Sequence, residues 1–173
     1  MDVFEAVRTV LAVRQYQDKP VPGEVVTRIV EAGRLTASSM NKQPWHFVVV
    51  QDRDRLRQLG DLVKTGPYIA QAPLAIAVAY ETASRFGVSD ASRAIQSMIL
   101  TAWADGVGSN WAGFTGLDGV RKLLGLPAEL DVLAVVPFGY PASAVGRGKK
   151  QRKPLAEVAS LNQYGQPFGS SVR

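Results

Sequence analysis

The sequence predicts an α+β fold in which helices pack on a mixed β-sheet. Three observations predict it. The 173 residues are 46% hydrophobic and 20% charged, which is typical of one ordinary globular domain. Hydrophobic patterns of helical and of strand type both occur, but they do not alternate in the strict order of a parallel β-α-β fold. No internal repeat or linker-like stretch divides the chain, so we expect a single domain over residues 1–173.

Five segments have the apolar spacing of amphipathic helices. They span residues 2–11, 23–35, 52–63, 89–105 and 118–124. Asp2 is suited to cap the first helix, and the fourth, which has the most regular spacing, ends at Gly106 and Gly108. The fifth ends at Gly125-Leu-Pro127, a combination that stops helices.

Three segments rich in aliphatic residues are predicted to be strands. They span residues 46–51, 73–80 and 131–140. In the first, the unbroken run Val48-Val-Val50 predicts burial on both faces of the sheet. The stretch 36–44 has no apolar period, so we expect a loop there. The last dozen residues cannot form a core alone, so they either extend freely or dock on another surface, such as a partner subunit.

The composition leaves few side chains for unaided chemistry. The chain has no cysteine, which excludes disulfides, thiolate nucleophiles and thiolate-bound metals. Its single histidine, His46, excludes a multi-histidine metal site, and a place at the start of a strand favours a structural role for it. We therefore expect no resident metal, and we expect any difficult reaction to depend on a borrowed cofactor.

The positive charge of the chain is local. The net charge is +5, and residues 147–153 hold five basic and no acidic side chains. Such a cluster suits one phosphate group better than a long nucleic-acid track. Because aromatic residues are not interleaved with it, a nucleic-acid-binding module is the weaker alternative, and a solvated tail is a further one. We expect no nucleic-acid partner.

The sequence shows no sign of a membrane segment. No stretch approaches the roughly 20 apolar residues of a membrane helix. The first residues carry acidic side chains and lack the basic and then apolar pattern of a secretory signal. We therefore expect a cytoplasmic protein without membrane contact.

Two loops carry candidate ligand groups. The first precedes a predicted strand and holds Ser38, Ser39, Asn41 and Gln43. These side chains both donate and accept hydrogen bonds, as an uncharged heterocycle with a polyol chain requires. The second, Trp111-Ala-Gly-Phe114, has small residues that would let backbone amides approach a flat ligand. Polar loop residues are common, so an ordinary solvated loop stays an alternative to a binding site.

Several segments, taken in order, resemble the nitroreductase family of flavin-dependent oxidoreductases. The most specific is Ala37-Ser-Ser-Met-Asn-Lys-Gln-Pro-Trp45, followed by Phe47-Val-Val-Val50. The others are Phe4-Glu-Ala-Val-Arg8, Val13-Arg14-Gln-Tyr16, Pro20-Val-Pro22, Ala72-Pro73, the helix over 90–108, Gly125-Leu-Pro127, Gly139-Tyr-Pro-Ala142 and Arg152-Lys-Pro-Leu155. Their order and spacing extend the resemblance over nearly the whole chain.

The resemblance implies a fold, cofactors and an assembly. Nitroreductases have a three-layer helix/mixed-sheet/helix fold, bind FMN non-covalently and take hydride from NADH or NADPH. They pass it to nitro groups, quinones or other electron-poor small molecules in a ping-pong cycle. They form intertwined homodimers with flavin sites at the interface. By this resemblance the C-terminal arm, about residues 155–173, is exchanged between subunits.

The resemblance also implies roles for individual residues. The residues assigned to the flavin phosphate are Arg14, Lys150 and Arg152. The residues assigned to the ribityl chain and the ring edge are Ser38, Ser39, Asn41 and Gln43. A backbone amide near Ala112 and Gly113 is expected to face the reactive ring nitrogen and to favour the reduced flavin. No side chain is expected to be catalytic, because the flavin carries the chemistry.

One segment departs from the family pattern. Nitroreductases read Arg-Arg-Ser where this chain has Val10, Leu11 and Ala12, so a cationic donor and a hydroxyl that hold the phosphate are missing. The segment between Leu62 and Pro73 also lacks a long insertion that often covers the flavin. The missing phosphate ligands therefore leave open a flavin- or nucleotide-binding protein without turnover. The family resemblance also leaves open a reductive dehalogenase and an enzyme that fragments its own flavin, because the family includes both.

Overall fold

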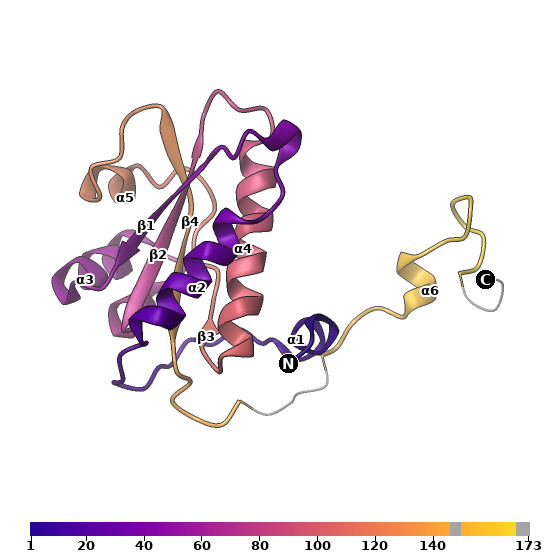
Figure 1. Ribbon diagram of the computed structural model, residues 1–173, viewed down its shortest axis with the longest axis horizontal. Helices are drawn as coiled ribbons and strands as arrows, with labels where there is room; N and C mark the ends of the chain where they lie inside the picture. Colours follow the sequence, from indigo (N-terminus) through magenta and orange to yellow (C-terminus); the bar gives the residue numbers. More distant parts are fainter. Residues whose placement is uncertain (146–149, 169–173) are drawn as a thin grey trace.

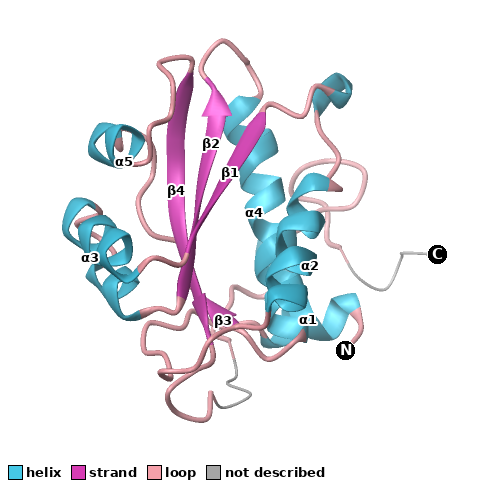
Figure 2. Cartoon of the chain, turned by 60° about the vertical axis from the view of Figure 1, so that its left-hand side comes forward, coloured by secondary structure: helices cyan, strands magenta, loops and turns pink. Residues whose placement is uncertain are grey.

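The computed structural model describes residues 1–145 and 150–168. Its middle layer is a four-stranded sheet with the strand order β1-β2-β4-β3 (Figure 2). The strands are β1 (Trp45–Val50), β2 (Leu74–Glu81), β3 (Gly108–Ser109) and β4 (Leu130–Gly139). All neighbouring strands pair antiparallel, so these strands form an antiparallel sheet where we expected a mixed one. Within the described residues, the one parallel contact is an isolated bridge between Ala12 and Ser109.

The antiparallel pairing of β1 and β2 follows from the segment that connects them. Val50, at the end of β1, pairs with Ala75, near the start of β2. Between them, α3 (Arg53–Leu62) packs against a 3-10 helix, η2 (Pro67–Gln71), and the chain returns to the end of the sheet that it left. A parallel pair would need a crossover to the opposite end.

Helices cover both faces of the sheet (Figure 2). The helices on one face are α1 (Val3–Thr9), α2 (Gly23–Arg34) and α4 (Gly87–Ala104), and those on the other are α3 and α5 (Asp118–Leu123). Successive residues of β2 serve the two cores, because side chains alternate along a strand. Ile76 and Val78 belong to the core with α2 and α4, whereas Ala75 and Ala77 belong to the core with α3 and α5. The expected α+β arrangement of helix, sheet and helix is confirmed.

The predicted helices and the three predicted strands are confirmed to within two residues at each end. Asp2 caps α1 as expected, because its side chain accepts a hydrogen bond of 2.7 Å from the Glu5 amide. Asp52 caps α3 in the same way with the Arg55 amide at 2.9 Å. The predicted loop 36–44 contains a short 3-10 turn, η1 (Ser39–Asn41). Sequence patterns did not predict β3, η2 or α6 (Leu155–Val158).

The prediction that the valine run is buried on both faces is wrong. β1 ends the strand order, so β2 is its one strand neighbour among the described residues. Val50 is buried, but Val49 is 38% exposed and Val48 is half-buried. The run of valines therefore belongs to an edge strand, and helices cover the faces of that strand only in part.

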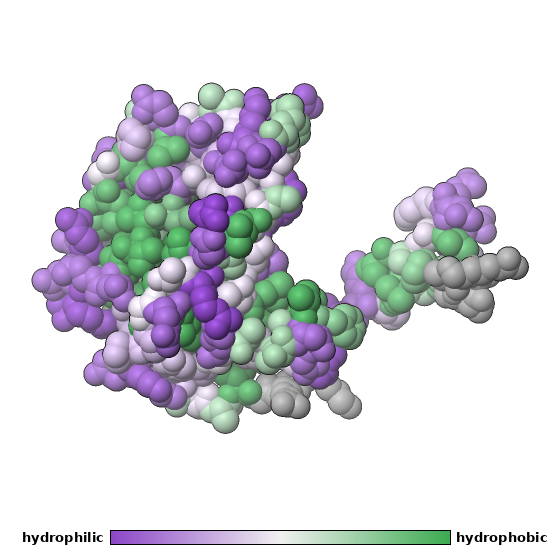
Figure 3. Space-filling view, viewed as in Figure 1, coloured by the Kyte–Doolittle hydropathy of each residue, from purple (hydrophilic) through white to green (hydrophobic). Residues whose placement is uncertain are grey.

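The C-terminal arm leaves the domain. In Figure 1 the segment with α6 extends away from the sheet and its helices, and Figure 3 shows apolar surface on it. Leu155, Val158 and Tyr164 of the arm are all largely exposed. The rest of the expected arm, residues 169–173, lies outside the described residues, as do Gly146 and residues 147–149 of the basic run.

Candidate functional site

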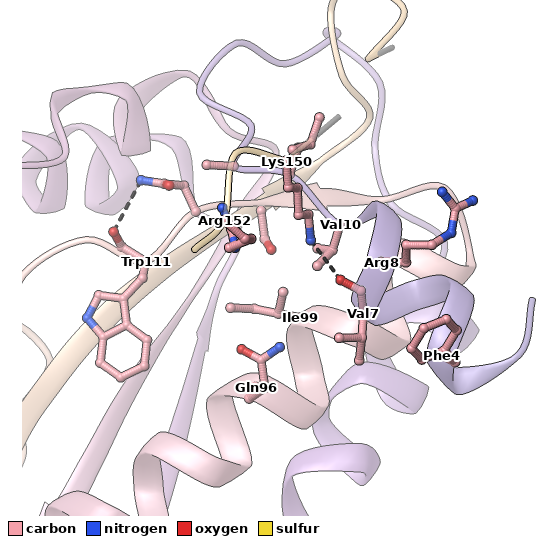
Figure 4. Close-up of a pocket in the computed structure, with 13 residues that line it drawn as sticks. Phe4, Val7, Arg8, Val10, Gln96, Ile99, Trp111, Lys150 and Arg152 are labelled. Carbon is pink, nitrogen blue, oxygen red and sulfur yellow. Dashed lines mark hydrogen bonds between the residues drawn. The ribbon is translucent and has the colours of Figure 1, made fainter. Parts of the chain in front are cut away.

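A cavity lies beside α1 and the second half of α4. It has a volume of about 690 Å³. Its walls come from α1, from the segment 10–12 that follows, from α4 and from residues 109–111, and residues of the segment 150–152 close one side (Figure 4). The apolar residues that line it are Phe4, Val7, Val10, Leu11, Ala12, Ile99 and Trp111. The polar ones are Arg8, Gln96, Ser109, Asn110, Lys150 and Arg152.

The wall formed by residues 10–12 depends on a close approach of two backbones. Val10 is extended and ends α1, and the Val13 amide then donates to the Ser109 carbonyl at 2.9 Å. Gly108 permits this approach, because a Cβ atom there would lie 2.4 Å from a Val13 methyl carbon. The segment that departs from the family pattern is therefore fixed alongside β3 and faces the cavity.

Two of the predicted phosphate ligands meet at this cavity. The Lys150 ammonium donates a 2.7 Å hydrogen bond to the Val7 carbonyl in the last turn of α1 (Figure 4). Burial, together with the nearby Arg152 guanidinium, lowers the pKa of Lys150. Arg152 also lines the cavity, and Arg8 lies there with its guanidinium paired to the Glu5 carboxylate at 2.8 Å.

Arg14 does not join this pair. It lines a neighbouring hollow of about 280 Å³, formed with residues 12, 13, 15, 141–143 and 145. Its guanidinium carbon lies 6.0 Å from the centre of the Tyr68 ring. The Tyr68 hydroxyl accepts a hydrogen bond from the Asn110 amide, and Asn110 lines the main cavity. Arg14 is thus not among the residues that line the cavity, although Ala12 lines both the cavity and the neighbouring hollow.

The amides of Ala112 and Gly113 both have partners in the chain. The Ala112 amide donates to the Val135 carbonyl at 3.1 Å, as part of a bridge to the sheet. The Gly113 amide donates to the Thr65 hydroxyl at 2.9 Å. Neither residue lines the cavity, but the preceding Trp111 does.

The loop residues lie at the other end of α4. The Ser39 amide and hydroxyl both bond to Asp90 in the first turn of α4, whereas Ile99 lines the cavity nine residues later. At 1.5 Å per helical residue, the two positions are separated by about 14 Å along the helix axis. None of Ser38, Ser39, Asn41 and Gln43 lines the cavity. Within one chain, the predicted ligands therefore form two separate groups.

Three residues near these groups were missed by the sequence reasoning. Tyr68 and Asn110 contact each other beside the cavity, and nothing in their local pattern predicts that contact. The sequence pattern does single out Asp90, because this residue lies on the same helical stripe as the buried residues Ala94 and Met98. An acidic residue on an apolar stripe is unusual and points to a specific partner.

No group of three or more metal-binding side chains occurs among the described residues. Within the same ranges, no helix is both long enough and apolar enough to span a membrane.

Comparison with known proteins identifies the class of fold and then the family. A crystal structure of a provisionally named NADH dehydrogenase/NAD(P)H nitroreductase from Bacteroides thetaiotaomicron superposes with a TM-score of 0.86 at 30% identity, over 94% of this chain and 98% of that one. The family model of the nitroreductase family matches residues 8–81 and 64–140. The chain therefore belongs to the nitroreductase family, and the predicted class, a nitroreductase-like oxidoreductase, is confirmed.

Two relatives extend this comparison. A provisionally named NADH dehydrogenase/NAD(P)H nitroreductase of Methanothermobacter thermautotrophicus is 35% identical over 154 residues, which cover 84% of this chain and 81% of that protein. An FMN reductase [NAD(P)H] of Bacillus subtilis is 26% identical over 188 residues, which cover 94% of this chain and 74% of that protein.

Proposed function

We propose that this protein is an FMN-dependent enzyme that uses NADH or NADPH to reduce nitro compounds, quinones or other electron-poor small molecules. The observation that carries the proposal is the cavity of about 690 Å³, which Lys150 and Arg152 line in a chain of the nitroreductase family. Small-molecule sites commonly have volumes of roughly 300–1,000 Å³. FMN, when bound, would supply the redox chemistry by taking hydride from the nicotinamide and passing it to the acceptor in a ping-pong cycle.

Lys150 and Arg152 fit the phosphate end of such a cofactor. An ammonium has three N–H donors, and one of those of Lys150 goes to the Val7 carbonyl, so two can reach phosphate oxygens. The guanidinium of Arg152 offers a planar fork of donors that matches a phosphate. A phosphate dianion would also relieve the repulsion between the two cations, which contributes to the lowered pKa of Lys150.

The apolar walls suit a flat ring. Val10, Leu11 and Ile99 line the cavity together with Trp111, and such walls exclude water from a bound heterocycle. We assign the Gly113 amide to the ring nitrogen that exchanges hydride, with the Thr65 hydroxyl giving up its bond as the ring enters. The Ala112 amide would stay in its bridge to Val135 and hold the neighbouring backbone in place.

A homodimer would bring the two groups of predicted ligands together. In one chain none of the predicted ligands in the loop at Ser38–Gln43 lines the cavity that holds Lys150 and Arg152. The face of α1 beside the cavity exposes Val3, Phe4 and Val7, of which the first two are each 76% exposed. Such a surface favours a partner subunit. We propose that the arm crosses to that subunit and that each site takes its loop from the partner.

The absorbance spectrum of the purified protein with and without added FMN tests the first part of the proposal. We expect a flavin spectrum that saturates at one FMN per chain. Steady-state oxidation of NADH and NADPH, with a nitroaromatic compound or a quinone as acceptor, should then give the parallel double-reciprocal lines of a ping-pong cycle. FMN binding without turnover would support the alternative of a binding protein, and the absence of FMN binding would contradict both.

A further inference from the structure

The loop before β1 is held in an unusual backbone conformation. Met40, Asn41 and Gln43 have positive φ angles of 53°, 54° and 52°. Residues other than glycine rarely adopt this left-handed region. Each one that does reduces the stability of the fold by about as much as one hydrogen bond contributes. Three of them within four positions persist only if contacts outside the loop hold it, so the loop needs an anchor.

Asp90 provides that anchor from the first turn of α4. Its side chain is 1% exposed. It accepts hydrogen bonds from the Ser39 amide at 3.0 Å and from the Ser39 hydroxyl at 3.1 Å. Its third partner is the guanidinium of Arg93, which is half-exposed and reaches the carboxylate from the solvent side. The buried carboxylate of Asp90 thus accepts two hydrogen bonds from a single loop residue, Ser39.

These bonds fix the polarity of the Ser39 hydroxyl. A carboxylate paired with an arginine can only accept hydrogen bonds, so the single hydroxyl proton of Ser39 must point at Asp90. What Ser39 can offer to a ligand is therefore its oxygen lone pairs. Ser38 has the opposite polarity, because its hydroxyl accepts from the Gln43 amide at 2.9 Å and keeps its own proton to donate.

We propose that Asp90 is a positioning residue that makes the Ser39 hydroxyl a hydrogen-bond acceptor toward FMN, so that the group FMN presents there is a donor. This inference rests on the proposed function. Two neighbouring hydroxyls of opposite polarity suit a ligand edge on which a donor, such as a ring N–H or a ribityl hydroxyl, lies next to an acceptor. A ligand with acceptors alone along that edge would meet the lone pairs of Ser39 and bind poorly.

The substitution Asp90→Asn tests the polarity while keeping the bond to the Ser39 amide, although it removes the ion pair with Arg93, which contacts the same carboxylate oxygen as the Ser39 hydroxyl. The oxygen of the introduced carboxamide can still accept from the Ser39 amide, but its NH2 group then donates to the Ser39 hydroxyl. The proton of the Ser39 hydroxyl then points toward FMN, where it meets the donor group that FMN presents. We expect the FMN dissociation constant to rise about tenfold, the effect of roughly one hydrogen bond.

A double-mutant cycle isolates the step through Ser39. Ser39→Ala should also raise the dissociation constant several-fold, and Asp90→Asn should add nothing further in the Ser39→Ala background, since no hydroxyl is left to reverse. Asp105→Asn is the matched control, because Asp105 is an ion-paired carboxylate at the other end of α4, with Arg28 at 3.3 Å. We expect that control to bind FMN like the wild type.

Trypsin cleavage after the exposed Lys42 reports the state of the loop without FMN. Asp90→Asn should be cleaved at about the wild-type rate, because the bond to the Ser39 amide remains, whereas Asp90→Ala should be cleaved several times faster. If Asp90→Asn binds FMN like the wild type, or if its effect multiplies with that of Ser39→Ala, the inference is wrong. If the wild-type chain does not bind FMN at all, the proposed function fails and the inference fails with it.

Discussion

Replacing Val10 by Arg and Ala12 by Ser together should tighten FMN binding. Both positions line the cavity that Lys150 and Arg152 share. Val10 is half-buried and Ala12 is exposed, so the longer side chains can enter the cavity without displacing core residues. The stem of an arginine at position 10 can lie along the apolar wall while its guanidinium reaches the phosphate.

The size of the effect follows from the contacts that the double substitution adds. A hydrogen bond to a charged group contributes on the order of 1.5–3 kcal/mol. Since about 1.4 kcal/mol changes a dissociation constant tenfold, one such bond should tighten FMN binding about tenfold to a hundredfold. Arg8 does not already fill this role, because its guanidinium is paired with the Glu5 carboxylate at 2.8 Å. The gain should shrink as salt is added, because screening weakens exposed charge pairs.

The assay is a fluorescence titration of FMN and of riboflavin against the wild type and the double variant. Riboflavin lacks the phosphate, so it should bind both proteins about equally. Gln58→Arg is a suitable control, because it adds a cation at an exposed residue of α3, on the other face of the sheet, that does not line the cavity. Unchanged FMN affinity in the double variant, or an equal gain for riboflavin, would show that this segment does not face the phosphate.

Three further predictions concern packing, pH and assembly. Gly108→Ala should destabilise the fold by about 1–3 kcal/mol in denaturant unfolding, because its methyl group would overlap Val13; Gly23→Ala, at a site with open space, should not. Burial, reinforced by Tyr68 and opposed by Arg14, raises the pKa of Tyr16 above its ordinary value of 10.0, so the unfolded chain loses that proton first. Stability should therefore fall as the pH rises above about 10, and Tyr16→Phe should reduce that fall; an identical slope in the variant would contradict this. Truncation after Val158 should weaken the proposed dimer and FMN binding, and a truncated chain that stays dimeric by light scattering and still binds FMN would argue against the exchanged arm.

Local sequence patterns were sufficient for most of the fold. The helices followed from apolar spacing and caps that act within a turn, such as Asp2 with the Glu5 amide. Local patterns were not sufficient where contacts between distant segments determine the structure. The run Val48–Val50 gives no information on strand order, so its place at an edge was missed. β3 has only two residues and exists because it pairs with β4.

The site was predictable only in part, for a similar reason. The family resemblance supplied Lys150 and Arg152, but the hydrogen bond of Lys150 to Val7 joins residues 143 positions apart. The left-handed conformation of the loop depends on Asp90, which lies 51 residues beyond Ser39. Neither separation produces a local pattern in the sequence. The same limit applies to Arg14, because its guanidinium lies near the ring of Tyr68, a residue far along the chain.

The central claim is that this chain transfers hydride from a nicotinamide through bound FMN. Its most direct test is the flavin absorbance of the FMN-loaded protein on addition of NADH or NADPH without oxygen. We predict rapid loss of the visible flavin band with one of these donors, and its full return when a quinone or a nitroaromatic compound is added. An FMN-loaded protein whose spectrum does not change with either donor would contradict the claim.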